Sequence, residues 1–67
     1  MPTLVVNGEK KDAAQVRTVR DLIAEMGFTG RAVAVEVNKK VVPRKQHDQT
    51  PLRDGDVVEV VTLVGGG

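Results

Sequence analysis

The first stretch of this chain has the pattern of a β-hairpin, with an apolar segment, a turn signal and then a polar segment. Residues 3–6 (TLVV) form a short apolar strand that runs into Asn7-Gly8. Asn-Gly is the strongest short signal for a tight hairpin turn, because both central residues of that turn need positive φ. A second strand is therefore expected over residues 9–14. Its residues are polar, so we expect it at a sheet edge, where charged side chains discourage association between sheets.

A second stretch, TVRDLIAEMGF at residues 18–28, has the spacing of an amphipathic helix. The residues that share its apolar face are Val19, Leu22, Ile23 and Met26. Thr18 is the expected N-cap, and Asp21 takes the place of the glutamate in a capping box. Gly27 supplies the left-handed stop. Phe28 is expected to fold back under the end of the helix.

The second half of the chain predicts three further strands. Residues 31–38 (RAVAVEVN) alternate, with valines 33, 35 and 37 on one face. A short strand follows at VVPR, and Pro43 ends it or confines it to an edge. Residues 45–52 are expected to form a loop or a single helical turn. The turn RDGD, whose Asp54 and Asp56 are expected to lie in water, then leads into a last strand at residues 57–63.

This order of elements predicts an α+β fold of the β-grasp (ubiquitin-like) type, with a mixed sheet of four to five strands packed on one helix. The hairpin precedes the helix, so the first and last strands can lie side by side as a parallel central pair. A helix stripe about 10 residues long covers one face of such a sheet and leaves the other face to water or to a partner. We assign residues 1–64 to the β-grasp domain and residues 65–67 to a flexible glycine tail.

The last strand carries apolar residues on both faces. Val58 and Val60 alternate with Glu59, which should face water. By strict alternation the residues that share the face of Glu59 are Val57, Val61 and Leu63. A bulge that changes the register, or β-propensity at an exposed position, is one explanation. The other is that Val57, Glu59 and Val61 form a docking face for a partner.

Composition limits the chemistry that the chain can carry. The 67 residues suit one small domain, and they include no cysteine, no serine and a single histidine, His47. A Cys–His pair or a Ser–His–Asp triad cannot be built from this inventory, and a zinc site would lack ligands. We therefore expect a protein that is not an enzyme and that binds no metal or cofactor itself.

The charge balance argues against two classes of partner. The net charge is +1 and acidic residues are mixed with basic ones, which gives no electrostatic footprint for nucleic acid or for an anionic membrane. No apolar run approaches the roughly 20 residues that span a bilayer, and the first residues lack the layout of a signal peptide. A cytoplasmic protein is the default expectation.

The three glycines that end the sequence, Gly65 to Gly67, allow three interpretations. They are a frayed end or cloning scar, a spacer to a fusion partner, or a functional arm. Glycine has no Cβ, so an extended glycine arm can enter a narrow channel that other residues would block. It also leaves its terminal carboxylate open to reagents from either side.

Several of these features together resemble the sulfur carrier proteins of thiamin biosynthesis, the ThiS family. The resemblance lies in Asn38, the hydrophobic pair before Pro43-Arg44, the Asp54-Gly55-Asp56 turn, and a hydrophobic strand that ends in glycines. The first half of the chain fits the family more loosely. Taken together, the two halves extend the likeness over the whole chain. Many members carry an aromatic residue after the Pro-Arg pair, where this chain has His47, and the role of His47 stays open.

The resemblance implies that the chain acts through the carboxylate of Gly67. An adenylating enzyme of the ubiquitin-activating type (ThiF-like) would use ATP and Mg²⁺ to convert it into an acyl-adenylate. Sulfur from a persulfide, supplied ultimately by a cysteine desulfurase, would displace AMP and leave a thiocarboxylate. That group would donate its sulfur to a thiazole synthase (ThiG-like). Both partners are expected to recognise Gly66 and Gly67. They are also expected to contact the residues just before them, Gly65, Val64 and Leu63.

Other functions fit the same pattern. One is a sulfur carrier for molybdopterin, cysteine or tRNA thiolation, and another is a ubiquitin-like protein modifier that forms an isopeptide bond through Gly67. The compact and nearly aromatic-free chain favours thiamin over molybdopterin. A plain binding module, such as the β-grasp domains of RNA-handling enzymes, would show a basic or aromatic face. Here the lysines are offset by nearby acidic and polar residues.

Overall fold

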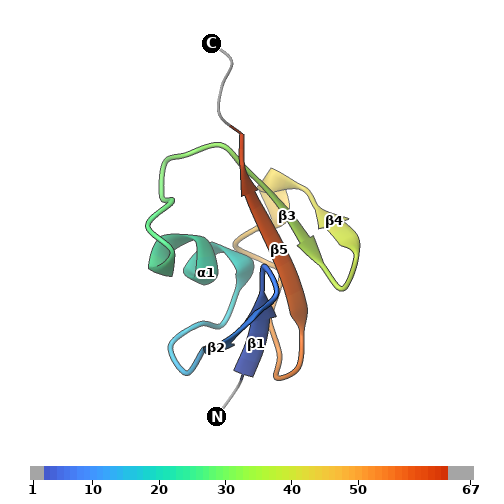
Figure 1. The fold of residues 1–67 in the computed structure, drawn as a ribbon. Helices are drawn as coiled ribbons and strands as arrows, with labels where there is room; N and C mark the ends of the chain where they lie inside the picture. The colour runs from blue at the N-terminus through green and yellow to red at the C-terminus, as the bar shows by residue number, and fades with distance from the viewer. Residues whose placement is uncertain (1–2, 64–67) are drawn as a thin grey trace.

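The computed structural model describes residues 3–63, which form one five-stranded sheet with an α-helix packed on one face (Figure 1). The elements in chain order are β1 (Thr3–Val6), β2 (Glu9–Asp12), α1 (Val19–Glu25), β3 (Val33–Val37), β4 (Lys40–Val42), the 3₁₀ turn η1 (Arg44–Gln46) and β5 (Val57–Thr62). The strand order is β2-β1-β5-β3-β4. β5 is central, parallel to β1 and antiparallel to β3, as the sequence predicts for a β-grasp fold.

Two tight turns form the hairpins of the sheet. Asn7 (φ 51°) and Gly8 (φ 84°) connect β1 to β2, as predicted. The second turn consists of Asn38 (φ 52°) and Lys39 (φ 68°), and it places Lys40 opposite Val37. The sequence pattern does not indicate this turn, and the strand was expected to begin one residue later, at Val41. The turn contains no glycine, and a lysine rarely adopts positive φ.

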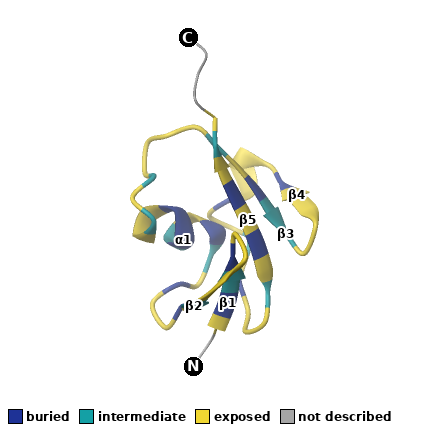
Figure 2. Ribbon diagram, viewed as in Figure 1, coloured by how far each residue is buried: buried dark blue, intermediate teal, exposed yellow. Residues whose placement is uncertain are grey.

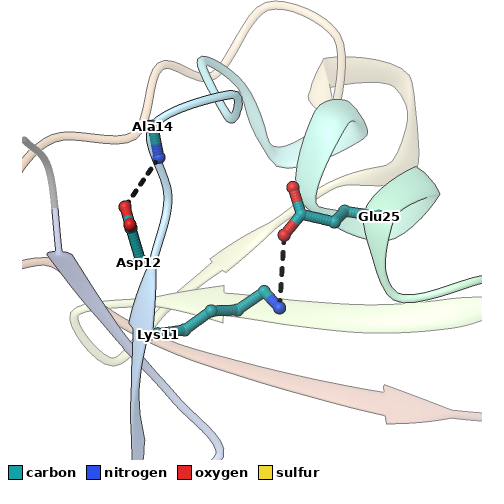
Figure 3. Close-up of polar contacts among 4 residues, drawn as sticks. All are labelled: Lys11, Asp12, Ala14 and Glu25. Carbon is teal, nitrogen blue, oxygen red and sulfur yellow. Dashed lines mark hydrogen bonds and ion pairs between the residues drawn. The ribbon is translucent and has the colours of Figure 1, made fainter.

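The second strand ends earlier than predicted. β2 stops at Asp12, because the Asp12 Oδ1 atom accepts a hydrogen bond from the Ala14 N–H (3.1 Å) and turns the chain (Figure 3). Ala13 is then buried in the core. The charged residues of β2 lie at the sheet edge as expected, and Lys11 forms an ion pair with Glu25 of α1 (3.2 Å).

Helix α1 begins with the predicted capping box. The Thr18 Oγ1 atom accepts from the Asp21 N–H (3.2 Å), and Asp21 Oδ2 accepts from the Thr18 N–H (3.2 Å). Backbone N–H groups of Arg17 and Thr18 that donate to this carboxylate lower the pKa of Asp21 below its ordinary value. The ionised carboxylate therefore stabilises the helix start above its ordinary pKa range, and this contribution is lost as the pH falls through the lowered value.

The helix ends at the predicted place, and the chain then turns back. Gly27 has φ 82°, and the Phe28 N–H donates to the Ile23 carbonyl (3.0 Å). Phe28 is half-buried against the core, as expected. The segment that follows crosses from α1 to the start of β3 (Figure 1).

The core lies between α1 and the inner face of the sheet (Figure 2). Its buried apolar residues are Leu4, Val6, Ala13, Val16, Val19, Leu22, Ile23, Val35, Val42, Leu52, Val58 and Val60. They alternate along the strands and recur at helical spacing in α1, as the sequence pattern predicts. Val33 and Val37 share the face of Val35 and are partly buried.

The long loop between β4 and β5 packs against the start of α1. The Val19 N–H donates to the Thr50 carbonyl (3.0 Å) and the Arg20 N–H to the His47 carbonyl (2.9 Å). The turn before β5 uses its two aspartates structurally. Asp54 is exposed and accepts from the Thr3 N–H (2.7 Å), whereas Asp56 is half-buried, so the expectation that both lie in water is wrong for Asp56.

Two asparagine side chains continue the hydrogen-bond pairing of β5 where its neighbours turn away. The Asn7 amide accepts from the Val60 N–H (2.8 Å) and donates to the Val60 carbonyl (3.1 Å). The Asn38 Oδ1 atom accepts from the Val57 N–H (3.0 Å), and its Nδ2 donates to Asp56 Oδ1 (3.0 Å). A side-chain amide offers the donor and acceptor of a peptide group. Each asparagine therefore replaces part of a neighbouring strand.

Replacing Asn7 with glycine tests this role, because glycine keeps the positive φ and removes the amide. We expect Asn7→Gly to lower the free energy of unfolding by about 1–3 kcal/mol, since both backbone groups of Val60 lose a partner. Urea denaturation measures the change. Lys39→Gly is the matched control at another position of positive φ and should not destabilise the fold. Equal stability of the two variants would contradict the role of the amide.

Candidate functional site

The sheet face that α1 leaves uncovered carries exposed valines along β5. Side chains of β5 alternate between the core and water, with Val58 and Val60 buried and Val57, Glu59 and Val61 exposed (Figure 2). β5 pairs residue by residue with β3 from Val58 to Thr62, so a bulge does not explain the exposed valines. Val57 and Val61 are 45% and 57% exposed. The structure thus places all three predicted docking residues on one surface.

Two more apolar residues join this surface. Leu63 is 57% exposed just beyond β5, and Val41 of β4 is 72% exposed. Val41 pairs with Glu36, which pairs with Glu59, so the three side chains form one row across three strands. We call Glu36, Val41, Val57, Glu59, Val61 and Leu63 the open face. Val41 was not among the predicted docking residues. Its alternation with the buried Val42 along β4 is the sequence signal that would have placed it on this face.

Two carboxylates lie opposite each other in the middle of the open face. Glu36 and Glu59 are direct partners in the antiparallel pairing of β3 and β5. Within residues 3–63 the ion pair between Lys11 and Glu25 is the only one, so neither carboxylate has a cation within 4 Å in that part of the chain. Like charges directly opposite on neighbouring strands destabilise a sheet. The open face therefore carries a local cost to folding.

Glu59→Gln should relieve this repulsion. We expect a rise in the free energy of unfolding of about 0.2–1 kcal/mol, because one of the two like charges is removed. The gain should shrink as salt is added, since salt screens exposed charges. Chemical denaturation at low and high salt measures it, with Glu9→Gln at the edge of the sheet as the control. A gain no larger than that of the control would contradict the repulsion.

The remaining predicted site residues, Val64, Gly65, Gly66 and Gly67, lie outside the described residues. The last described residue is Leu63, whose N–H donates to the Ala32 carbonyl (2.9 Å). The chain is therefore paired with the segment before β3 as far as Leu63. The open face lies beside this point.

Two kinds of site were sought among residues 3–63, a cluster of metal ligands and a membrane-spanning helix. Between residues 3 and 63, no three His, Asp or Glu side chains gather in a group that would hold a metal ion. The same residues include no helix long and apolar enough to cross a membrane.

Sequence and structure comparisons both point to one family. A profile of the ThiS family matches residues 4–67. The sulfur carrier protein ThiS of Thermus thermophilus is 40% identical over 62 residues, which cover 92% of this chain and 95% of that protein. The crystal structure of the thiamine biosynthesis protein (ThiS) of Geobacter metallireducens is 32% identical and has a TM-score of 0.79. It covers 97% of this chain and 99% of that one.

Part of a larger protein is also similar. A thiazole synthase of Paramagnetospirillum magneticum is 42% identical over 64 residues, covering 96% of this chain and 20% of that protein. The chain therefore spans about a fifth of that relative's length. The family profile, the full-length likeness to carriers and the shared fold agree with one another. The chain belongs to the ThiS family, a family of sulfur carriers and not of enzymes, and has its β-grasp fold.

Proposed function

We propose that this chain carries sulfur for thiamin biosynthesis as a thiocarboxylate on Gly67. One observation carries the proposal: the match to the ThiS family runs as far as Gly67. The likeness to a named sulfur carrier over 95% of that protein's length supports it. The residue composition fits this role, since the chain has no cysteine and no serine. A carrier needs a reactive terminus and a docking surface but no nucleophilic side chain of its own.

The carboxylate must be activated before sulfur can be attached. A terminal carboxyl with an ordinary pKa of about 3.5 is ionised at neutral pH and does not acylate a sulfur nucleophile. Adenylation removes this barrier: the carboxylate oxygen attacks the α-phosphorus of ATP, and pyrophosphate leaves. ATP and Mg²⁺ are used by a ThiF-like activating partner, and this chain supplies only the carboxylate.

Sulfur then replaces the adenylate. The terminal sulfur of a persulfide, formed with a cysteine desulfurase, attacks the acyl carbon, so a carbon–sulfur bond forms and AMP leaves. A thiol cleaves the remaining sulfur–sulfur bond and becomes oxidised to a disulfide, which releases the thiocarboxylate. The acceptor is a thiazole synthase. A segment similar to this chain within the thiazole synthase of Paramagnetospirillum magneticum supports that partnership.

The open face is the proposed docking surface for these enzymes. Val61 and Leu63 are exposed at the end of β5 from which the chain continues to Gly67, and the core covers the other face of the sheet. Apolar residues grouped on an uncovered face mark a site of protein contact. A partner that binds there holds β5 beside its own catalytic site.

Gly66→Val should block adenylation and leave the fold intact. A valine side chain would collide with the walls of a channel that fits only glycine. Position 66 comes after the residues that form the core, so the substitution should not lower the stability of the fold. ATP–pyrophosphate exchange with the adenylating enzyme measures activation, and thermal unfolding checks the fold. Gln15→Val, at an exposed turn, is the control and should exchange normally. Normal exchange with Gly66→Val would defeat the proposed reading of the tail.

Val61→Asp should weaken docking more than it lowers stability. The side chain is 57% exposed, so an aspartate there stays solvated, but it joins the face of Glu36 and Glu59 in a strand that favours valine, and the free energy of unfolding should fall by about 1 kcal/mol. Loss of a residue that anchors an interface, the role proposed here for Val61, costs about 2 kcal/mol or more of binding. The Michaelis constant of the adenylating enzyme for the carrier, compared with the Gln15→Asp control, gives the binding effect. Similar losses of stability and affinity would favour a purely structural role.

A further inference from the structure

A second surface of interest lies on the helix side of the sheet. A hollow of about 380 Å³ is bordered by α1, the segment from Phe28 to Val33, and η1. Three apolar side chains, Ile23, Phe28 and Val33, contribute to its lining. Figure 1 shows that this segment connects the end of α1 to the start of β3. We call this feature the arginine hollow, after the residues described next.

Three arginines line the hollow, and no acidic residue does. They are Arg20 of α1, Arg31 before β3, and Arg44 of η1. Because Lys11 and Glu25 form the sole ion pair of residues 3–63, none of these guanidinium groups has a carboxylate within 4 Å in that range. The whole chain has a net charge of only +1, so three positive charges around one hollow are a local excess. Such a concentration of charge attracts an anion.

The buried His47 adds a polar group to the same lining. The residue is only 8% exposed, and its Nε2 lies 3.2 Å from the Val42 carbonyl. A carbonyl accepts, so Nε2 carries the hydrogen and Nδ1 is the nitrogen left for another partner. No buried side-chain nitrogen of residues 3–63 lacks a hydrogen-bond partner, so Nδ1 is not sealed from solvent.

The hollow lies next to the root of the C-terminal segment. Val33, in its lining, pairs with Thr62 of β5, and the Leu63 N–H donates to the Ala32 carbonyl (2.9 Å). Arg31 directly precedes this contact in the chain. The open face and the arginine hollow thus lie on opposite sides of the sheet, and both lie near the end of β5.

We propose that the arginine hollow is a docking site for an acidic segment of the activating enzyme. A carboxylate of that segment would pair with the guanidinium groups, whose planar forks match carboxylate geometry. A neighbouring apolar side chain of the same segment would pack on Phe28 and Val33. Arginine and aromatic residues are enriched where interfaces gain most of their affinity. This inference rests on the proposed function, because it takes the activating enzyme as the partner.

The test compares two triple variants of equal charge. Arg20→Gln, Arg31→Gln and Arg44→Gln together neutralise the hollow. Lys39→Gln, Lys40→Gln and Arg53→Gln together remove the same charge from exposed positions that do not line it.

ATP–pyrophosphate exchange is measured with a ThiF-type enzyme as a function of carrier concentration. The variant with the neutralised hollow should have a KM for the carrier that is about tenfold higher or more, with kcat unchanged. Its KM should also depend less on salt concentration, whereas the KM of the control variant should stay near the wild-type value. Thermal unfolding of both variants confirms that they fold.

Equal KM values for the two variants would overturn the hollow as a docking site while leaving the proposed function standing. A chemical-shift change of residues 28–33 on adding inorganic phosphate to the isolated chain, with equal KM values, would assign the hollow to a small anion instead. If the wild-type chain supports no exchange at all, the proposed function fails and this inference fails with it.

Discussion

The hydrogen-bond pairing of β5 is the constraint on which the rest of the structure depends. β1 pairs with β5 only at Val57 and Val58, and β3 pairs with it from Val58 to Thr62. The amides of Asn7 and Asn38 supply the missing partners at Val60 and Val57. A small domain buries little apolar surface and therefore has little stability to spare. Unpaired backbone groups in its central strand would each lower that stability further. With these bonds in place, β5 is a fixed strand as far as the last described residue.

The alternation of side chains along β5 then separates stability from partner binding. Val58 and Val60 lie under α1 and stabilise the fold, whereas Val57 and Val61 lie on the open face and contribute little to it. The opposed carboxylates of Glu36 and Glu59 oppose folding on that same face. A surface whose residues do not serve the fold is free to serve recognition. This division suits a carrier whose chemistry is performed by the enzymes that bind it.

Local sequence patterns predicted much of this structure because local physics determines it. The Asn7-Gly8 turn, the capping box of Thr18 and the faces of β5 each follow from a few neighbouring residues. The turn at Asn38 was missed because it lacks glycine, and the structural role of Asp56 depends on a residue 18 positions away. The arginine hollow combines side chains from three segments, so no local pattern indicates it. The roles of Val64 to Gly67 stay predictions.

The central claim is that Gly67 carries sulfur, and the intact mass of the chain tests it most directly. The chain is incubated with a ThiF-type adenylating enzyme, MgATP, a cysteine desulfurase, cysteine and a thiol, and is then weighed by mass spectrometry. The account predicts a gain of about 16 Da as sulfur replaces one oxygen, and no gain in a chain that lacks Gly67. An unchanged mass of the full chain, under conditions in which the same enzymes thiolate another ThiS carrier, would contradict it.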